Sequence, residues 1–386
     1  MLLTIFQIKQ TKYMSKCYIC EYEISPDNLY KEHIILNSIG GRLKSSSLIC
    51  NECAPHFDAI DAALGKQLNT IGLVLDIKRD RYKNPYTKAK IVNTGEEVSL
   101  ISGGKIAPIK PTIDVRYDED NIYLSVSTRD ENQMKEVLKG LKRKHSWIDV
   151  QEMMSNAIKR QEFIDSSIKY QLTFGGDEAF RAICKMATSF YIYKGGERNN
   201  ISHLIPYIRD GQLNNTVWHY HPENITNYNL ENIEVLHSLF VVGNPSEKIL
   251  YAYIELFSTL KFLVLLSDAY TGKEYQEFYS FDVIGQKIRD KVIEISLTRD
   301  EVLKVIQLRE NNLQQIQNSL RCLFKTINNK QIYESFSKEV ENVIENFFKD
   351  IPQDTVFTKE MTSELTIECT DKIAALLHDK GFFNQE

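Results

Sequence analysis

The sequence predicts an α+β protein. Its expected parts are a cysteine-rich module of two strands and a helix, a mixed α/β region with an antiparallel sheet, and a C-terminal helical segment. Three observations carry this prediction. Two Cys-x-x-Cys pairs enclose residues 17–53, strand-like runs with short links fill residues 236–266, and apolar residues recur at helical spacing from residue 298 onward.

Length and composition predict a protein of several domains. The 386 residues divide by pattern into a cysteine module (14–75), a basic linker with a small β region (76–150), an α/β domain with an antiparallel meander (151–295) and a helical region (296–386). The net charge of −5 gives no overall attraction to nucleic acid, so such a contact needs a local basic patch.

The seven cysteines and the N-terminus predict a reducing, cytoplasmic location. Residues 1–13 place their lysines after a short apolar run, which is the reverse of a signal peptide. No stretch approaches the ~20 apolar residues of a membrane span. We therefore expect no membrane contact.

The two cysteine pairs predict one structural zinc site. Four thiolates in two Cys-x-x-Cys knuckles are the expected ligand set for a tetrahedral zinc ion, here Cys17, Cys20, Cys50 and Cys53. The loop that they close contains Glu32-His33. An alternative role of His33 as a zinc ligand is disfavoured, because four cysteines already fill the coordination sphere.

Within the module the order of elements is knuckle, strand, loop, strand, knuckle, helix. The Gly40-Gly41 pair predicts a turn between short strands at 34–35 and 43–49. Apolar residues at helical spacing begin just after Cys53 and predict a helix there.

A basic stretch at 78–90 follows the module. Basic residues interleaved with tyrosines are typical of a nucleic-acid contact, and a solvated linker is the equal alternative. The candidate nucleic-acid ligands are Lys78, Arg79, Arg81, Lys83, Lys88 and Lys90.

The middle of the chain alternates strands and helices. Alternating patterns predict antiparallel strands within 89–127, and helices are expected at 130–145 and between the glycine pairs Gly175-Gly176 and Gly195-Gly196. The basic cluster at 142–145 either complements the dipole of a helix end or contacts phosphate. Strands at 236–242, 249–257 and 260–266 predict a meander that is covered on both faces.

The last ninety residues are predicted to be helical. Thr298 and Glu301 form a capping box, the helical period runs from 302 to 323, and two further helices are expected at 331–349 and 358–379. The apolar stripe at 302–323 either joins copies of the chain or packs on the meander.

Three other candidates are weaker. Cys184 lies on an apolar helical stripe, so a buried thiol is favoured over a nucleophile. His219 and His221 would share one face of a strand, but a partly buried polar cluster is favoured over a metal site because no third ligand lies near in sequence.

Residues 14–66 resemble the HNH endonucleases, the ββα-metal nucleases, in the branch with a flanking zinc knuckle. The shared residues are Cys17-x-x-Cys20, Glu32-His33-Ile34-Ile35, Gly40-Gly41, Leu48, Cys50-x-x-Cys53 and Phe57. The resemblance implies metal-assisted hydrolysis of DNA phosphodiester bonds, with His33 as the general base and Glu32 as a catalytic ligand to Mg²⁺ or Mn²⁺.

The sequence departs from the family at Ala54, where the family has an asparagine that binds the catalytic metal ion. A methyl group cannot coordinate an ion. Either the site of this copy is inactivated, by a natural or an engineered substitution, or His56 or Asp58 replaces the ligand. Asp58 would share the helix face of Ala54, whereas His56 would not. We favour inactivation at Ala54.

The leading hypothesis is a regulated bacterial anti-phage defence nuclease that acts on DNA as a homo-oligomer. One alternative is a zinc-dependent nucleic-acid-binding module without catalysis. The other is an effector that senses a small molecule or a protein activator through residues 150–386.

Overall fold

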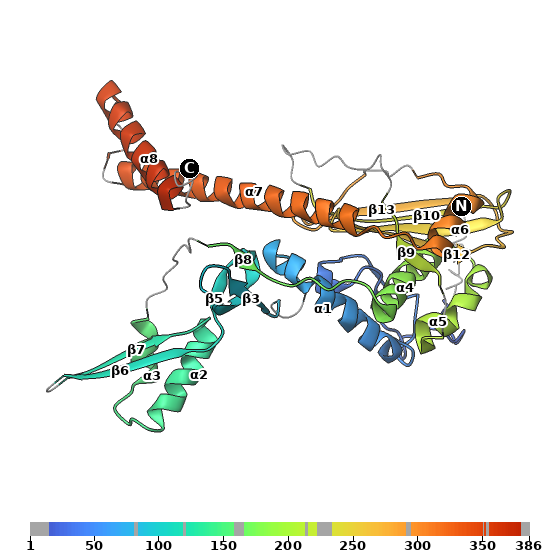
Figure 1. Ribbon diagram of the computed structural model, residues 1–386, viewed down its shortest axis with the longest axis horizontal. Coiled ribbons are helices and arrows are strands. Elements are labelled where there is room, and N and C mark those ends of the chain that lie inside the picture. The colour runs from blue at the N-terminus through green and yellow to red at the C-terminus, as the bar shows by residue number, and fades with distance from the viewer. Residues whose placement is uncertain are drawn as a thin grey trace, which may run out of the picture. The chain divides into compact units, whose positions relative to one another are not determined.

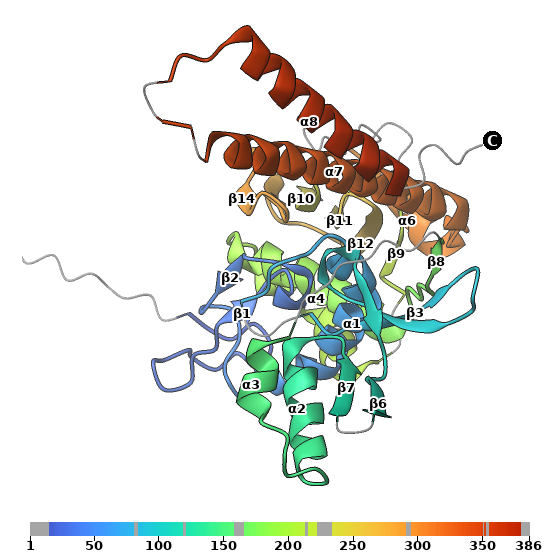
Figure 2. The ribbon, with the colours of Figure 1, turned by 90° about the vertical axis from the view of Figure 1, so that its left-hand side faces the viewer.

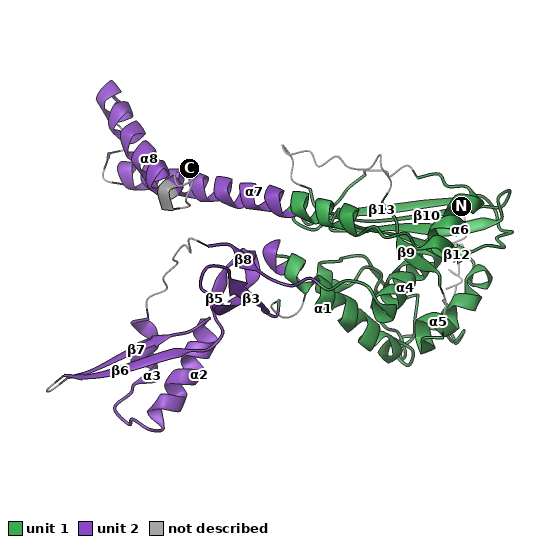
Figure 3. Cartoon of the chain, in the orientation of Figure 1, with its two compact units in different colours: residues 1–72, 76–84, 173–323 green, residues 73–75, 85–172, 324–386 purple. Residues whose placement is uncertain are grey.

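The computed structural model describes residues 15–80, 84–118, 121–157, 166–212, 215–221, 234–290, 295–349, 351–352 and 355–379. The chain forms two compact units (Figure 3). The first comprises residues 1–72, 76–84 and 173–323, and the second comprises residues 73–75, 85–172 and 324–386. The four-part division by sequence pattern stays a prediction. The α+β class is confirmed, because helices and antiparallel sheets both occur throughout.

The cysteine module of the first unit has the predicted strand–strand–helix order. Strands β1 (Glu32–His33) and β2 (Lys44–Ser45) pair antiparallel, with His33 directly opposite Lys44. The helical part starts as the 3-10 turn η2 (Ala54–Phe57), with Pro55 in its first turn, and continues as α1 (Asp58–Val74). The prediction of the first strand at 34–35 was wrong, because β1 pairs at 32–33 and Ile34 and Ile35 are buried in the core. The second predicted strand, at 43–49, is limited to the two residues of β2.

Gly40 and Gly41 make the turn between the two strands. A short 3-10 helix, η1 (Asn37–Ile39), ends at Gly40, which has a left-handed backbone with φ of +90°. A Cβ on Gly41 would collide with the backbone of Ile35. Both positions therefore require glycine, and the turn brings β2 back alongside β1.

A six-stranded antiparallel sheet forms the centre of the first unit (Figure 1). Its strand order is β14-β13-β10-β11-β12-β9. The strands are β9 (Val217–His219), β10 (Leu236–Asn244), β11 (Ile249–Leu256), β12 (Leu260–Ser267), β13 (Tyr275–Asp282) and β14 (Lys287–Ile288). The predicted meander is confirmed as β10–β12, whereas the more polar strand β13 was missed by the apolar pattern.

Helices cover both faces of this sheet, as its nearly continuous apolar strands predict. Phe240 packs with Val302 of α6 (Arg299–Leu308) on one face. Tyr279 lies opposite Leu239, hence on the other face, and its ring contacts Phe190 of α4 (Asp177–Tyr193). Helix α4 also faces the cysteine module, so it joins the module to the sheet. The short helix α5 (Ile205–Asp210) and two 3-10 turns, η4 (Arg198–Asn200) and η5 (Ser202–Leu204), follow α4.

The second unit contains a four-stranded sheet, a hairpin and helices. The sheet order is β5-β4-β3-β8, with β3 (Thr87–Ile91), β4 (Glu97–Leu100), β5 (Ile106–Pro108) and β8 (Ile168–Lys169), and the 3-10 turn η3 (Ser102–Gly104) lies between β4 and β5. In both views α2 (Glu131–Lys142) and α3 (Val150–Ser155) lie beside the hairpin of β6 (Thr112–Asp118) and β7 (Asn121–Ser127) (Figure 1, Figure 2). The predicted β region and the helix at 130–145 are thus confirmed.

The C-terminal helices differ from the prediction in their boundaries. The capping box at Thr298 and Glu301 is confirmed, but the helix that it opens ends at Leu308, where Arg309 adopts a left-handed backbone. One helix, α7 (Leu313–Phe348), then replaces two predicted segments, because no glycine or proline interrupts residues 313–348. Helix α8 (Lys359–Asp379) matches its prediction. No helix among the described residues is long and apolar enough to cross a membrane.

Candidate metal centre and HNH site

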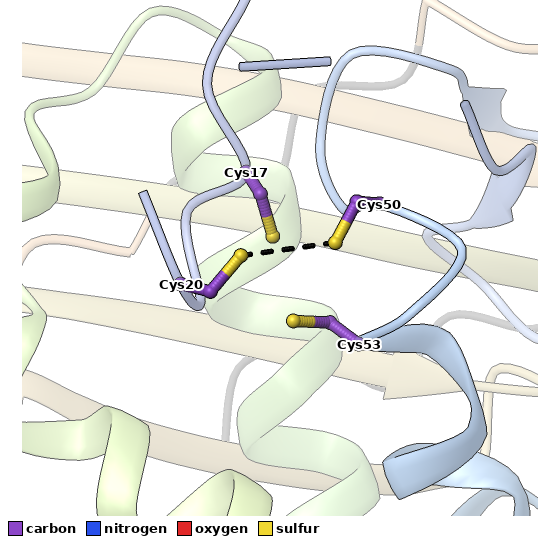
Figure 4. A group of neighbouring side chains, drawn as sticks. All are labelled: Cys17, Cys20, Cys50 and Cys53. Carbon is purple, nitrogen blue, oxygen red and sulfur yellow. Dashed lines mark hydrogen bonds between the residues drawn. The ribbon is translucent and has the colours of Figure 1, made fainter. Parts of the chain in front are cut away.

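The four predicted zinc ligands come together in the structure. The sulfur atoms of Cys17, Cys20, Cys50 and Cys53 all lie within 4.8 Å of one another (Figure 4). Cys20 Sγ and Cys50 Sγ are 3.7 Å apart. A tetrahedral zinc ion with Zn–S bonds of about 2.3 Å places its sulfur ligands about 3.8 Å apart. The cluster therefore fits a structural zinc ion and supplies four thiolates of the softness that zinc prefers.

The first knuckle is fixed to α4 and to the turn that follows it. Tyr18 Oη lies 3.0 Å from Ser189 Oγ, and Arg198 Nε donates to the carbonyl oxygen of Tyr18 at 2.7 Å. Arg198 Nη1 also lies 3.0 Å from Glu21 Oε1. Residues more than 170 positions away thus hold the cysteine loop, which positions the two strands that follow it.

Glu32 is buried and paired with a lysine from outside the module. Its side chain is 6% exposed, and Lys185 Nζ of α4 forms an ion pair with Glu32 Oε1 at 2.6 Å. The same ammonium donates a hydrogen bond to Asp61 Oδ2 of α1 at 2.6 Å. Lys185 is itself 1% exposed. One buried ammonium group therefore forms ion pairs with two carboxylates.

Burial and the ammonium group of Lys185 act in opposite directions on the two carboxylates of this cluster. Burial raises the pKa of Glu32, Lys185 opposes that effect, and the charges of Asp61 and Asp58 add to it. Asp61 Oδ1 is buried without a hydrogen bond, whereas Glu32 Oε1 lies against the ammonium group of Lys185. Burial and the neighbouring carboxylates raise the pKa of both Glu32 and Asp61, and Lys185 opposes this rise in both.

Ala54 and its two candidate replacements lie at the start of the helix. Ala54 is buried in η2, whereas His56 and Asp58 are exposed. The charge of Asp58 acts on Glu32, while that of His56 acts on Asp210. Asp58 therefore acts on the charge of Glu32, and the role of either residue as an ion ligand stays a prediction. Among the described residues, no three histidine, aspartate or glutamate ligand atoms of this site gather as closely as the four cysteines do.

His33 lies beside an aspartate that sequence reasoning missed. His33 Nε2 is 3.4 Å from Asp80 Oδ2, and Lys44 Nζ is 3.2 Å from the same oxygen. Arg42 Nη1 donates to Asp80 Oδ1. The spacing of Arg42 and Lys44, two apart after the glycine turn, could have placed both side chains on one face of the strand. No local signal linked them to Asp80.

The predicted basic stretch is distributed over both units. Lys78 is exposed, and Arg79 Nη2 donates to Asn69 Oδ1 at 2.8 Å in surroundings whose burial lowers the pKa of the guanidinium. Lys88 and Lys90 project from β3 on the face opposite the buried Ala89. Arg81 and Lys83 lie outside the described residues. The role of the stretch in nucleic-acid binding stays a prediction.

The weaker candidates follow the favoured interpretations. Cys184 is fully buried in α4. His219 packs against the rings of Phe174 and Phe262, and burial lowers the pKa of both His219 and His221 to about 4. No third histidine, cysteine or carboxylate of the described chain joins these two histidines as a metal ligand.

Two short strands, a helix and a four-cysteine cluster that fits a zinc ion together form a ββα module. Residues 17–69 match the model of the HNH endonuclease family, as the motifs of the module predict. No curated protein and no solved structure matches the chain. The match covers the module and leaves the sheet and the second unit without a counterpart.

Proposed function

We propose that the chain is a metal-dependent HNH endonuclease that hydrolyses DNA phosphodiester bonds, with His33 as the general base. The observation that carries the proposal is the arrangement within the family-matched residues. His33 ends a short strand whose first residue, Glu32, pairs with Lys185 of α4. The partly exposed imidazole of His33 lies 3.4 Å from Asp80 Oδ2 and near enough to Asp61 for their charges to interact. A neutral imidazole is a suitable base for a water molecule at cellular pH.

In this proposal each residue of the site has a separate role. His33 takes the proton of the attacking water, and its strand position aims the imidazole at the solvent-facing side of the module. The carboxylates of Glu32 and Asp58 would hold Mg²⁺ or Mn²⁺, hard ions that prefer oxygen ligands and keep several waters. Such an ion supplies charge stabilisation to the scissile phosphate when bound. Lys185 holds the carboxylate of Glu32 in place from the buried side.

Ala54 limits this activity, because the helix start supplies no ligand there. We expect the Ala54→Asn variant to gain at least tenfold in Mg²⁺- or Mn²⁺-dependent nicking of supercoiled plasmid, since even residues that only support metal ligands change activity by roughly 10- to 100-fold. Adding His33→Ala should remove the gain, since the base contributes roughly 10²- to 10⁴-fold.

Ala59→Asn is the matched control, because Ala59 is exposed on α1 outside the site. It should leave nicking unchanged. If the Ala54→Asn protein binds no Mg²⁺ or Mn²⁺ by calorimetry and nicks no DNA, the endonuclease proposal fails. If that protein binds DNA without cutting it, a zinc-dependent binding module is the better description, an alternative favoured by the ion pair that already occupies Glu32.

The biological setting that we propose is bacterial antiviral defence in the cytoplasm, by a homo-oligomer under the control of a small-molecule or protein activator. Its support is the large part of the chain outside the HNH module, which the family match does not explain. Light scattering of the full chain tests the oligomer. A thermal-shift screen of the full chain with nucleotides tests the small-molecule activator.

A further inference from the structure

Three positively charged or hydrogen-bonding groups converge on one carboxylate at the surface of the HNH module. His33 comes from β1, Lys44 from β2 directly opposite it, and Arg42 from the segment between the glycine turn and β2. All three reach the carboxylate of Asp80, which lies beyond the module in sequence. Two of them share one oxygen of that carboxylate, and Arg42 takes the other.

We propose that His33, Arg42 and Lys44 form a phosphodiester-binding subsite, and that the carboxylate of Asp80 occupies this subsite until nucleic acid displaces it. The inference rests on the proposed function, since it gives the base His33 its substrate. A phosphodiester and a carboxylate each carry one negative charge on two oxygens. Arginine and lysine recognise both groups through the same charge-assisted hydrogen bonds.

The arginine of the subsite is held in place by neutral partners as well as by Asp80. Arg42 Nε donates to Gln286 Oε1 at 2.9 Å, and Arg42 Nη2 donates to the carbonyl oxygen of Lys78 at 3.1 Å. Removing the negative charge of Asp80 therefore leaves two hydrogen bonds that keep the guanidinium in position. An arginine that is oriented in this way is suited to bind an incoming anion without reorganisation.

The subsite is open to solvent. Arg42 and Lys44 line an open groove of about 580 Å³, whose other wall includes Tyr279, Phe281 and Ile288 of the six-stranded sheet. The side chain of Asp80 is 31% exposed and that of Lys44 is 33% exposed. Nucleic acid can therefore approach Arg42 and Lys44 from the groove, and the partly exposed His33 lies beside Asp80. Screened contacts of this kind are weak enough to exchange.

A simpler interpretation is that Asp80 only fastens the segment after α1 to the module. Its backbone N–H donates to Asn37 Oδ1 at 3.2 Å, which already fastens this segment. The two interpretations differ in one measurable respect. If Asp80 only fastens the segment, removing its charge does not raise the affinity for nucleic acid. If Asp80 occupies the subsite, removing its charge raises that affinity.

The test compares the full-length wild-type chain with Asp80→Asn and Asp76→Asn. Asp76 is exposed in the same connection but lies outside the cluster, so its variant matches the change in net charge. Affinity for a fluorescein-labelled DNA duplex is measured by anisotropy over a series of NaCl concentrations, without Mg²⁺, Mn²⁺ or a chelator. These conditions prevent cleavage and leave the zinc ion in place.

We expect Asp80→Asn to bind roughly three- to tenfold more tightly than wild type, and more tightly than Asp76→Asn, at low salt. Adding Arg42→Gln or Lys44→Gln to Asp80→Asn should cancel the gain and lower the slope of log affinity against log salt by about 0.9 each. Circular dichroism of each variant reports whether it is folded. Because Arg42 and Lys44 are substituted separately, the test remains possible if one of these variants does not fold.

Equal affinities of Asp80→Asn and Asp76→Asn overturn the subsite, as does a gain that persists in both basic variants. Either result still allows the proposed endonuclease function if Ala54→Asn nicks plasmid in the presence of metal ions. Conversely, a gain in affinity that depends on Arg42 and Lys44, without nicking by Ala54→Asn, retains the subsite and rejects the endonuclease. A complete absence of DNA binding in all variants overturns both.

Discussion

The cysteine cluster and the Glu32–His33 site lie in the same small module but are assembled in different ways. All four cysteines lie within residues 17–53, and their partners in the cluster are one another. Glu32 and His33 instead contact residues from outside the matched family region, Lys185 of α4 and Asp80 of the following segment.

The ligands of the cysteine cluster are all local in sequence, whereas the partners of Glu32 and His33 are not. A tetrahedral zinc ion needs only its four thiolates as ligands, although α4 and Arg198 also contact the cysteine loop. The charge of Glu32 in its buried position needs the ammonium group of Lys185. The rest of the first unit therefore controls the state of the HNH site, and each of the following predictions tests one side of that contrast.

Loss of zinc should have the largest effect on stability. We expect one tightly bound zinc ion per chain, and we expect the double variant Cys50→Ser, Cys53→Ser to lose it together with the structure of the module, because binding of structural zinc is worth about 10 kcal/mol or more. Elemental analysis counts the ion, and near-ultraviolet circular dichroism with limited proteolysis reports the module.

The matched control is Cys184→Ser, which changes a buried thiol outside the cluster. That variant should keep its zinc content while losing some stability through the buried hydroxyl group. A well-folded wild-type protein without zinc would contradict the assignment of the cluster.

The same contrast explains what could be predicted from sequence. The zinc ligands, the strand–strand–helix order and the family follow from spacings within 60 residues, where local geometry decides the structure. The partners of Glu32 and His33 could not be predicted, because Lys185 lies on the apolar α4 and Asp80 lies within the basic stretch, and neither position carries a local signal. The break between α6 and α7 was likewise missed, since Arg309 adopts the left-handed conformation without a glycine.

The next largest effect is expected for Lys185→Met. This change keeps the volume of the side chain but leaves Glu32 and Asp61 without their shared ammonium group, which should cost about 3–5 kcal/mol of unfolding free energy. Urea unfolding followed by Trp218 fluorescence in a Trp147→Phe background reports on the first unit, where Trp218 lies on β9.

Lys194→Met is the control for this measurement. Lys194 lies directly after α4 and pairs with Glu277 at 2.8 Å, but both side chains are about one-third exposed, so its loss should cost at most about 1 kcal/mol. Adding Glu32→Gln to Lys185→Met should recover part of the lost stability. Equal losses from the two lysines would show that the Glu32 site does not depend on α4.

A smaller, pH-dependent effect is expected for His237, a buried contact between the module and the sheet. His237 Nε2 donates to the carbonyl oxygen of Ile39 at 2.9 Å, and its Nδ1 accepts from the N–H of Phe257 at 3.1 Å, so the ring is neutral. Burial lowers the pKa of His237 to about 4. The native state thus binds the proton less readily than the unfolded chain, whose histidine has a pKa of about 6.5.

Stability is therefore fully present above pH 6.5 and is lost as the pH falls toward 4. Between pH 7 and pH 5 the loss from this one group amounts to about 2 kcal/mol. In His237→Gln the amide can still donate to Ile39 but does not titrate, so urea unfolding should show a pH dependence that is flatter by about that amount. His56→Gln, which changes an exposed histidine, should keep the wild-type slope. An unchanged slope in His237→Gln would mean that the acid sensitivity of the first unit arises elsewhere and that this contact does not link the η1 turn of the module to the sheet.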